Sequence, residues 1–190
     1  MAQSARVSRR NRRPRGFRAT ARGRLDVSRI EARRLTVVKR PVDLPALVSD
    51  VVARVQAITV GHPVDLEVAG SVPPVEADPV RIEQVLTNLL SNAAKYGTPG
   101  TAITVRVQHR DDEDVVAVTN LGAGITPEEY PTLFSRFYRA SSARNGRQEG
   151  LGLGLYISHG IVEAHAGRIW AESIPGQTTT FFFALPLTGG

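Results

Sequence analysis

Residues 81–97 read RIEQVLTNLLSNAAKYG and combine an apolar stripe with a row of amides. Apolar side chains recur every three or four residues, which is the period of one buried helix face. They are Ile82, Val85, Leu86, Leu89, Leu90 and Ala93. Asp78 and Pro79 come just before, and an aspartate followed by proline is a typical helix start. The sequence therefore predicts a long, half-buried helix here.

The amides of this segment lie on another face of the predicted helix. Gln84, Asn88 and Asn92 recur every four residues, and Lys95 follows one turn later. Amide oxygens can ligate a hard cation without neutralising it, which suits Mg²⁺ shared with phosphates. A solvated polar face has the same pattern, so the spacing alone leaves both interpretations open.

The flanking segments predict an α+β domain. Asp43 precedes a second helix, whose apolar stripe runs from Leu44 to Val55, and a glycine ends a third helix predicted over residues 151–166. Alternating β-branched runs predict strands at 64–68, 102–109, 115–120, 168–173 and 179–185. Three helices and about five strands in this order predict an α+β fold, a two-layer α/β sandwich.

Length and composition exclude several classes of protein. The 190 residues suffice for one domain, and no apolar run approaches the length of about 18 residues that a membrane span needs. The absence of cysteine excludes disulfides and thiolate metal sites. No apolar run follows the first arginines, so a secretory signal is not expected. We therefore expect a cytoplasmic protein.

Charge separates the first residues from the rest of the chain. Residues 1–40 carry 14 Lys and Arg against two acids, a net 14 − 2 = +12, whereas the remainder carries 10 − 16 = −6. Residues 1–24 contain nine arginines and no acid, which predicts a disordered basic tail. Such a tail could contact nucleic acid or anionic lipid, or could be a solvated arm.

One glycine-rich segment follows the strand predicted at 115–120, and another lies at the start of the last predicted helix. VTNLGAGI at 118–125 places Gly122 and Gly124 directly after a strand, where glycine permits a tight turn and close approach to a ligand. EGLGLGL at 149–155 places Gly150, Gly152 and Gly154 before a helix, where free backbone N–H groups can bind phosphate. Neither segment has the spacing of a P-loop.

Together these motifs resemble the ATP-binding catalytic domain of bacterial two-component sensor histidine kinases, in the gyrase, Hsp90, histidine kinase and MutL superfamily. NLLSNAAKYG, GAGI, LFSRFYRA at 133–140, GLGLGLYI and GQTTTFFFALPL at 176–187 are similar to its five boxes, in order. The resemblance implies the Bergerat-type ATP-binding fold over residues 41–187, with a mixed, mostly antiparallel sheet covered on one face by three helices. It also implies a remnant of the dimerisation helix and its linker over 25–40, between tails at 1–24 and 188–190.

The resemblance also implies roles for single residues. Asn92, with Asn88 beside it, would hold Mg²⁺, and Lys95 would face the phosphates of ATP. Tyr96 and Ile125 would flank adenine, and Thr179 would approach it. The remaining nucleotide contacts implied are Asn120, Gly122, Gly124, Gly150, Leu151, Gly152, Leu153 and Gly154. A lid over 138–150 would add Arg139, Arg144 and Arg147, while Phe134 and Phe137 would anchor it by packing.

The sequence departs from the family at two points. The family has an aspartate that accepts a hydrogen bond from the adenine amine, and this chain has Asn120 there. An uncharged acceptor predicts weakened ATP binding. None of the four histidines lies upstream of the domain, and His109, His159 and His165 fall in predicted strand or helix as structural residues. We therefore expect the phosphoacceptor histidine on a separate partner chain.

Three functional hypotheses follow. The first is a histidine kinase domain that donates the γ-phosphate of ATP to the partner's histidine, for relay to a response regulator. The second is a catalytically weak or silent module that regulates a kinase by protein contacts, and the third is nucleic-acid binding by residues 1–24. ATP hydrolysis is disfavoured, because hydrolysing relatives carry a glutamate where this chain has Asn88, and an amide cannot deprotonate water.

Overall fold

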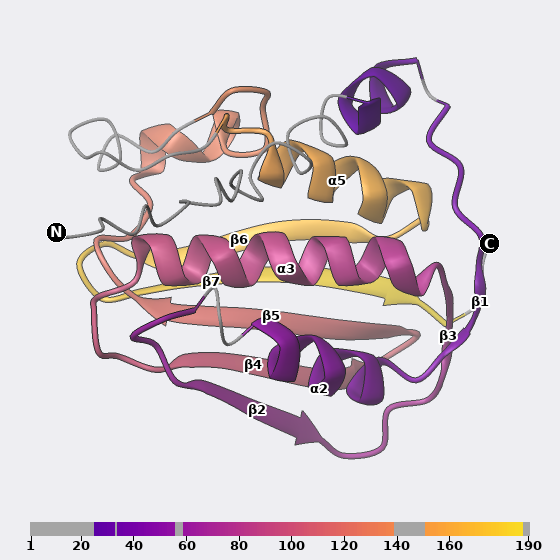
Figure 1. The fold of residues 1–190 in the computed structure, drawn as a ribbon, viewed down its shortest axis with the longest axis horizontal. Helices are drawn as coiled ribbons and strands as arrows, with labels where there is room; N and C mark the ends of the chain where they lie inside the picture. Colours follow the sequence, from indigo (N-terminus) through magenta and orange to yellow (C-terminus); the bar gives the residue numbers. More distant parts are fainter. Residues whose placement is uncertain (1–24, 33, 56–58, 139–150, 188–190) are drawn as a thin grey trace, which may run out of the picture.

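The structure is a computed structural model that describes residues 25–32, 34–55, 59–138 and 151–187 (Figure 1). The predicted tails at 1–24 and 188–190 lie outside the described residues. Within the described part of the chain, no helix is both long and apolar enough to cross a membrane.

One five-stranded sheet forms a layer of the molecule. Its strand order is β2-β4-β5-β7-β6. The strands are β2 (Val64–Ala69), β4 (Ile103–Arg110), β5 (Glu113–Leu121), β6 (Arg168–Ile174) and β7 (Thr178–Pro186). β2 pairs parallel with β4, and the other neighbours are antiparallel. The mixed, mostly antiparallel sheet expected from the resemblance is confirmed.

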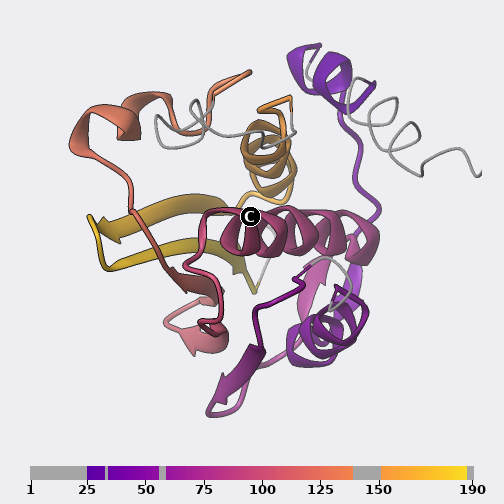
Figure 2. The same cartoon turned by 60° about the vertical axis from the view of Figure 1, so that its left-hand side comes forward.

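Three helices cover one face of this sheet: α2 (Leu44–Val55), α3 (Pro79–Tyr96) and α5 (Gly154–Ala164) (Figures 1 and 2). The apolar stripe of α3 is buried as predicted, and it packs with inward-facing sheet residues such as Val105, Val118 and Phe183 into one core. α3 lies between the other two helices and contacts both, so each of its faces meets a different element.

Aspartates begin the first two of these helices. Asp43 Oδ1 accepts a hydrogen bond from the N–H of Ala46 at 2.9 Å. Asp78 Oδ1 accepts from the N–H groups of Val80 and Arg81 at 3.1 and 3.3 Å. Both contacts satisfy backbone donors that have no partner inside a helix, which is why the two starts could be predicted.

Other element boundaries differ from those expected. α5 begins at Gly154 rather than 151, and the Leu153 before it provides no side-chain cap. A two-stranded sheet, β1 (Arg40–Val42) with β3 (Val75–Ala77), was not predicted, because three-residue strands carry too little pattern. Residues 25–31 are helical, as expected for the end of a longer helix, and η1 (Pro127–Thr132) is a 3₁₀ turn.

His165 has the structural role expected of it. It is buried beyond the end of α5, where Nδ1 lies 2.8 Å from the carbonyl oxygen of Ile161 and Nε2 accepts from the N–H of Asp78 at 2.9 Å. The imidazole therefore joins the end of α5 to the start of α3.

Candidate functional site

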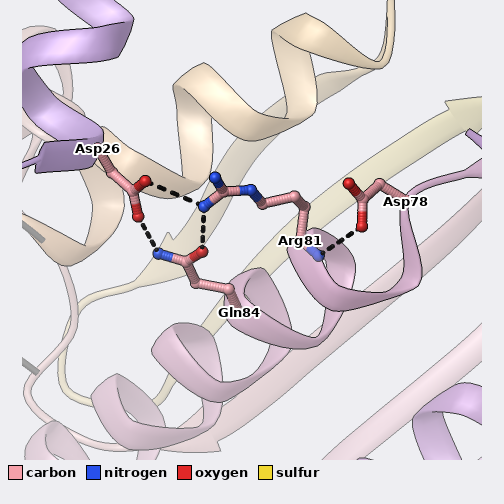
Figure 3. Close-up of polar contacts among 4 residues, drawn as sticks. All are labelled: Asp26, Asp78, Arg81 and Gln84. Atoms are coloured by element: carbon pink, nitrogen blue, oxygen red, sulfur yellow. Dashed lines mark hydrogen bonds and ion pairs between the residues drawn. The ribbon is translucent and has the colours of Figure 1, made fainter. Parts of the chain in front are cut away.

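The amide row of α3 divides between two partners. Asn88 Nδ2 donates to the carbonyl oxygen of Gly154 at 3.2 Å and to Ser158 Oγ at 3.3 Å, so it ties α3 to the start of α5. Gln84 instead donates to Asp26 in the helix at residues 25–31 (Figure 3). Gln84 is thus a structural residue, which leaves Asn88 and Asn92 as the candidate ligands of this row.

The residues present suit a cation shared with phosphates. Both bonds of Asn88 use its Nδ2, which leaves Oδ1 as an acceptor, and the half-buried Asn92 side chain makes no hydrogen bond with any described residue. The described residues contain no cluster of three or more His, Cys, Asp or Glu that could hold a metal alone. Mg²⁺ at this point would therefore need phosphate oxygens beside the amides, as expected for a metal that keeps few protein ligands.

The last turn of α3 leads to the second half of the site. Lys95 Nζ lies 5.0 Å from the centroid of the Tyr96 ring, which is within the range of a cation–π contact. Gly97 forms an isolated bridge with Gly122, and the N–H of Thr98 donates to the carbonyl oxygen of Leu121 at 2.8 Å. These contacts hold Tyr96 beside the end of β5.

Asn120 and Thr179 form one buried pair at this end of the sheet. They are directly opposite each other in the register of β5 and β7, and only 4% and 6% of their surfaces are exposed. Asn120 Nδ2 donates to the carbonyl oxygen of Leu121 at 3.1 Å. That bond fixes the orientation of the amide, so Oδ1 is the atom left to accept a hydrogen bond.

Ser173 supports this pair, and the sequence analysis missed it. Its Oγ donates to the carbonyl oxygen of Thr178 at 2.8 Å, accepts from the N–H of Ile125 at 3.0 Å, and lies 2.9 Å from Thr179 Oγ1. One hydroxyl therefore joins the GAGI turn to β7. A signal existed, because Ser173 follows Ile169 and Ala171 at alternate positions facing the core, where a hydroxyl is unexpected.

The two glycines of the GAGI segment are required by close packing. A Cβ at position 122 would lie 2.4 Å from the carbonyl oxygen of Tyr96. At position 124 the backbone has a φ of +84°, and a Cβ would lie 2.7 Å from Pro175 Cα. Neither position can hold a larger residue, so close packing around the site explains part of the need for glycine in this segment.

The glycines before α5 pack against the segment 133–138. A Cβ at Gly152 would lie 2.5 Å from the carbonyl oxygen of Tyr138, whereas at Gly154 it would be in ordinary contact with Asn88. Leu153 is buried and Leu151 is exposed. Asn88 therefore contacts Gly154, and the role of these residues in binding phosphate stays a prediction.

The expectation that both phenylalanines pack is half wrong. Phe134 packs against the core, and its ring centroid lies 5.7 Å from that of His159. Phe137 is 65% exposed, because a φ of +61° turns the chain there and its backbone takes the place near Gly152. The predicted phosphate contacts Arg139, Arg144, Arg147 and Gly150, and the lid apart from Tyr138, lie outside the described residues.

The site thus has two ends along one side of α3. Asn88, Asn92 and the glycines before α5 form one end, and Tyr96, Asn120 and Thr179 form the other. From Asn88 to Tyr96 the helix rises about 12 Å, at 1.5 Å per residue. Amide oxygens beside the start of α5 at one end, with a buried acceptor at the other, can bind an elongated anionic ligand.

Comparison with known proteins identifies relatives of the chain. The model of the histidine kinase-, DNA gyrase B- and HSP90-like ATPases matches residues 77–189. The adaptive-response sensory kinase SasA of Synechococcus elongatus is 43% identical over 122 residues, which are 64% of this chain and 31% of SasA. The chain therefore spans less than a third of that relative's length.

Solved structures agree with this match. The mycobacterial sensor histidine kinase MprB is 29% identical with a TM-score of 0.69, over 77% of this chain and 97% of that one. Full-length ShkA in complex with AMPPNP, at 23% identity, has a TM-score of 0.79 over 90% of this chain and 36% of that one, and it shares the fold. The predicted two-layer ATP-binding fold is confirmed. The chain belongs to the family of histidine kinase-, DNA gyrase B- and HSP90-like ATPases, in which it resembles the domains of sensor histidine kinases.

Proposed function

We propose that this domain binds Mg²⁺-ATP and donates the γ-phosphate to a histidine on a partner chain, from which a response regulator receives it. The observation that carries the proposal is the site's division along α3. Asn88 contacts Gly154 at one end, and the buried Asn120–Thr179 pair lies at the other. ATP has matching parts, a triphosphate and a base.

The base end would recognise adenine by hydrogen bonds. Asn120 Oδ1 is the free acceptor of a fixed amide and would accept from the exocyclic amine. Ser173 Oγ has a single proton, which it donates to the carbonyl oxygen of Thr178. The Thr179 hydroxyl must therefore donate its own proton to Ser173, so it can only accept a hydrogen bond from a ligand or water. Tyr96 and Ile125 would flank the ring from α3 and from the GAGI turn.

The phosphate end would position the γ-phosphate and neutralise its charge. Asn92 would ligate Mg²⁺ with Asn88 beside it, and Lys95 and the backbone N–H groups of residues 151–153 would face the phosphates. Phosphoryl transfer depends mainly on positioning and charge neutralisation, so no water-activating base is required. Asn88 supports transfer over hydrolysis, because it is an amide already bonded to Gly154 and Ser158.

A nucleotide titration tests the binding step. We expect a fluorescent ATP analogue to saturate the full chain in Mg²⁺ and to bind far more weakly in a chelator. Asn92→Ala should abolish the magnesium dependence, because it removes the proposed ligand, whereas Ser91→Ala on the exposed neighbouring position should leave it intact. Equal magnesium dependence in Asn92→Ala would assign the metal to other residues.

Transfer requires a second experiment. Full-length chain with γ-labelled ATP and a histidine-bearing dimerisation domain should place acid-labile label on that domain, and adding a response regulator should discharge it. The alternative function, regulation of a kinase by protein contacts alone, is motivated by Asn120. It predicts that the chain inhibits a full-length kinase and that ATP does not compete. No binding at millimolar ATP would favour that alternative.

A further inference from the structure

The imidazole of His62 lies in the loop before β2 and contacts the segment at residues 97–101, which joins α3 to β4. Its Nδ1 lies 3.0 Å from the carbonyl oxygen of Thr101. A carbonyl oxygen can only accept, so Nδ1 must carry the proton of this hydrogen bond. The same ring packs against Gly97, because a Cβ placed there would lie 3.1 Å from His62 Cε1. One half-buried side chain therefore holds both ends of the segment.

Backbone hydrogen bonds between the two loops add to this contact. The N–H of Gly100 donates to the carbonyl oxygen of Gly61 at 3.1 Å. The N–H of Ile103 donates to the carbonyl oxygen of Pro63 at 2.8 Å. His62 lies between these two acceptors in the chain, so its imidazole fixes the segment at the point where the two loops run side by side.

Thr98 connects this contact to the end of β5. Its carbonyl oxygen accepts from the N–H of Thr101 at 3.1 Å and from Thr101 Oγ1 at 2.6 Å. Its own N–H donates at 2.8 Å to the carbonyl oxygen of Leu121, which also accepts from Asn120 Nδ2 at 3.1 Å. A continuous row of hydrogen bonds therefore runs from His62 to the Asn120 amide.

We propose that His62 is a positioning residue for recognition of the base. It fixes Thr98, and thereby the carbonyl oxygen of Leu121 that orients the Asn120 amide and leaves Oδ1 free to accept. The inference rests on the proposed function, because it assigns that oxygen to the exocyclic amine of adenine. His62 acts through the hydrogen bonds alone and does not touch the nucleotide, so a change at His62 should affect one base more than another.

Binding of ATP and of GTP to the full chain in Mg²⁺ tests the proposal. Guanine has a carbonyl oxygen where adenine has its amine, so it cannot donate to Asn120 Oδ1 in the same way. His62→Ala should therefore weaken ATP binding by about threefold to tenfold, the value of one neutral hydrogen bond, and should weaken GTP binding less. An unchanged ratio of the two affinities would overturn the proposal, because a general loss of structure lowers both equally.

Two rescue measurements separate positioning from simple packing. His62→Asn keeps an N–H donor for Thr101 and should retain most of the preference for ATP. In His62→Gly, added free imidazole should restore the preference, since the ring's place is open to the surface. His62 lines a surface hollow of about 510 Å³ together with Thr59, Val60, Gly61, Pro63 and Gly100. His159→Ala on α5 is the matched control and should keep the wild-type preference with and without imidazole.

The outcomes distinguish this inference from the proposed function. A wild-type chain that binds no nucleotide in Mg²⁺ would overturn both. A wild-type chain that binds ATP without preferring it to GTP would overturn the inference alone. So would a wild-type preference for ATP that His62→Asn loses as fully as His62→Ala, because the hydrogen bond to Thr101 would then not be what positions Asn120.

Discussion

At the residue scale, the Asn120 side chain has two hydrogen-bonding roles that favour different residue types. Its Nδ2 supports the carbonyl oxygen of Leu121, while its Oδ1 is the acceptor proposed for adenine. A carboxylate would improve only the second role, since hydrogen bonds to charged groups are worth about 1.5–3 kcal/mol and neutral ones about 0.5–1.5. We therefore predict that Asn120 binds ATP more weakly than an aspartate would, while it keeps the bond to Leu121 that an aspartate would lose.

Asn120→Asp should tighten ATP binding by about tenfold, the equivalent of about 1.4 kcal/mol. The same change should lower the free energy of unfolding of the empty protein by about 1–3 kcal/mol, because a buried oxygen replaces the donor to Leu121. Nucleotide titration and urea unfolding measure the two effects. Gln177→Glu adds an equal charge at an exposed position nearby and controls for long-range electrostatics. An unchanged affinity in Asn120→Asp would remove this residue from the adenine site.

Ser173→Ala should weaken both the fold and the site. The variant leaves Ile125 N–H and the Thr178 carbonyl without their partner, which should cost about 1–3 kcal/mol of unfolding free energy and reduce nucleotide affinity. Thr119→Val is the matched control, because Thr119 forms a similar hydroxyl pair with Thr180 elsewhere in the same sheet. Equal nucleotide affinities for Ser173→Ala and wild type would limit Ser173 to stability.

At the element scale, the junction of α3 and α5 should be sensitive to acid. Burial lowers the pKa of His165 below its ordinary value, against a smaller opposing effect of its bond to Ile161, with Lys39 and Asp78 also acting on it. The neutral ring is the form that accepts from the Asp78 N–H. Its stabilising contribution is therefore complete above the unfolded pKa of about 6.5 and is lost as pH falls through the lowered folded pKa.

Urea unfolding at pH 8 and pH 5.5 measures this contribution. His165→Ala should cost about 1–3 kcal/mol at pH 8, because the buried Asp78 N–H loses its acceptor. The difference between wild type and variant should shrink at the lower pH. His159→Ala removes an imidazole at a partly exposed position of α5 and is the matched control. A difference for His165→Ala that is constant with pH would exclude His165 as the acid-sensitive group.

At the scale of the whole molecule, the two ends of β5 are expected to affect different properties, the stability of the fold at Asp114 and nucleotide binding at Asn120. Asp114 lies six residues, or about 20 Å, from Asn120 along the strand. Asp114 is fully buried, and burial raises its pKa despite a 2.8 Å bond from His109 Nδ1. Among the described residues, its Oδ2 has no hydrogen-bond partner. The ionised Asp114 carboxylate therefore lowers the free energy of unfolding, and it does so at the end of the sheet remote from the candidate site.

Asp114→Asn should stabilise the protein at neutral pH and leave nucleotide affinity unchanged. A raised folded pKa means that the native state binds the proton more readily, so the wild type loses stability as pH rises through that pKa. The advantage of the variant should accordingly grow with pH in urea unfolding between pH 4 and pH 8. A variant less stable than wild type at pH 8 would show that the His109 ion pair outweighs desolvation.

Local patterns along the sequence predicted most of the elements and the motifs of the candidate site. The stripe of α3, the caps at Asp43 and Asp78 and the alternating strands all depend on neighbouring residues, and the glycine and asparagine motifs lie within single segments. These features could be predicted because helix period, strand alternation and capping are short-range. The short strands β1 and β3 could not be predicted, because three residues carry too little pattern and the strands form by pairing with each other.

Only the tertiary structure decided which residues of separate segments meet. Ser173 joins the GAGI turn to β7, and Gln84 binds Asp26 rather than a ligand. Phe137 is exposed, and Ile30 packs against Gly160. Each outcome depends on sheet register or helix packing between residues far apart in the chain, and a one-residue shift of register would reverse the face on which Ser173 lies. The sequence therefore specifies which chemical groups are present, and the packing of α3 against its neighbours specifies which of them remain available to a ligand.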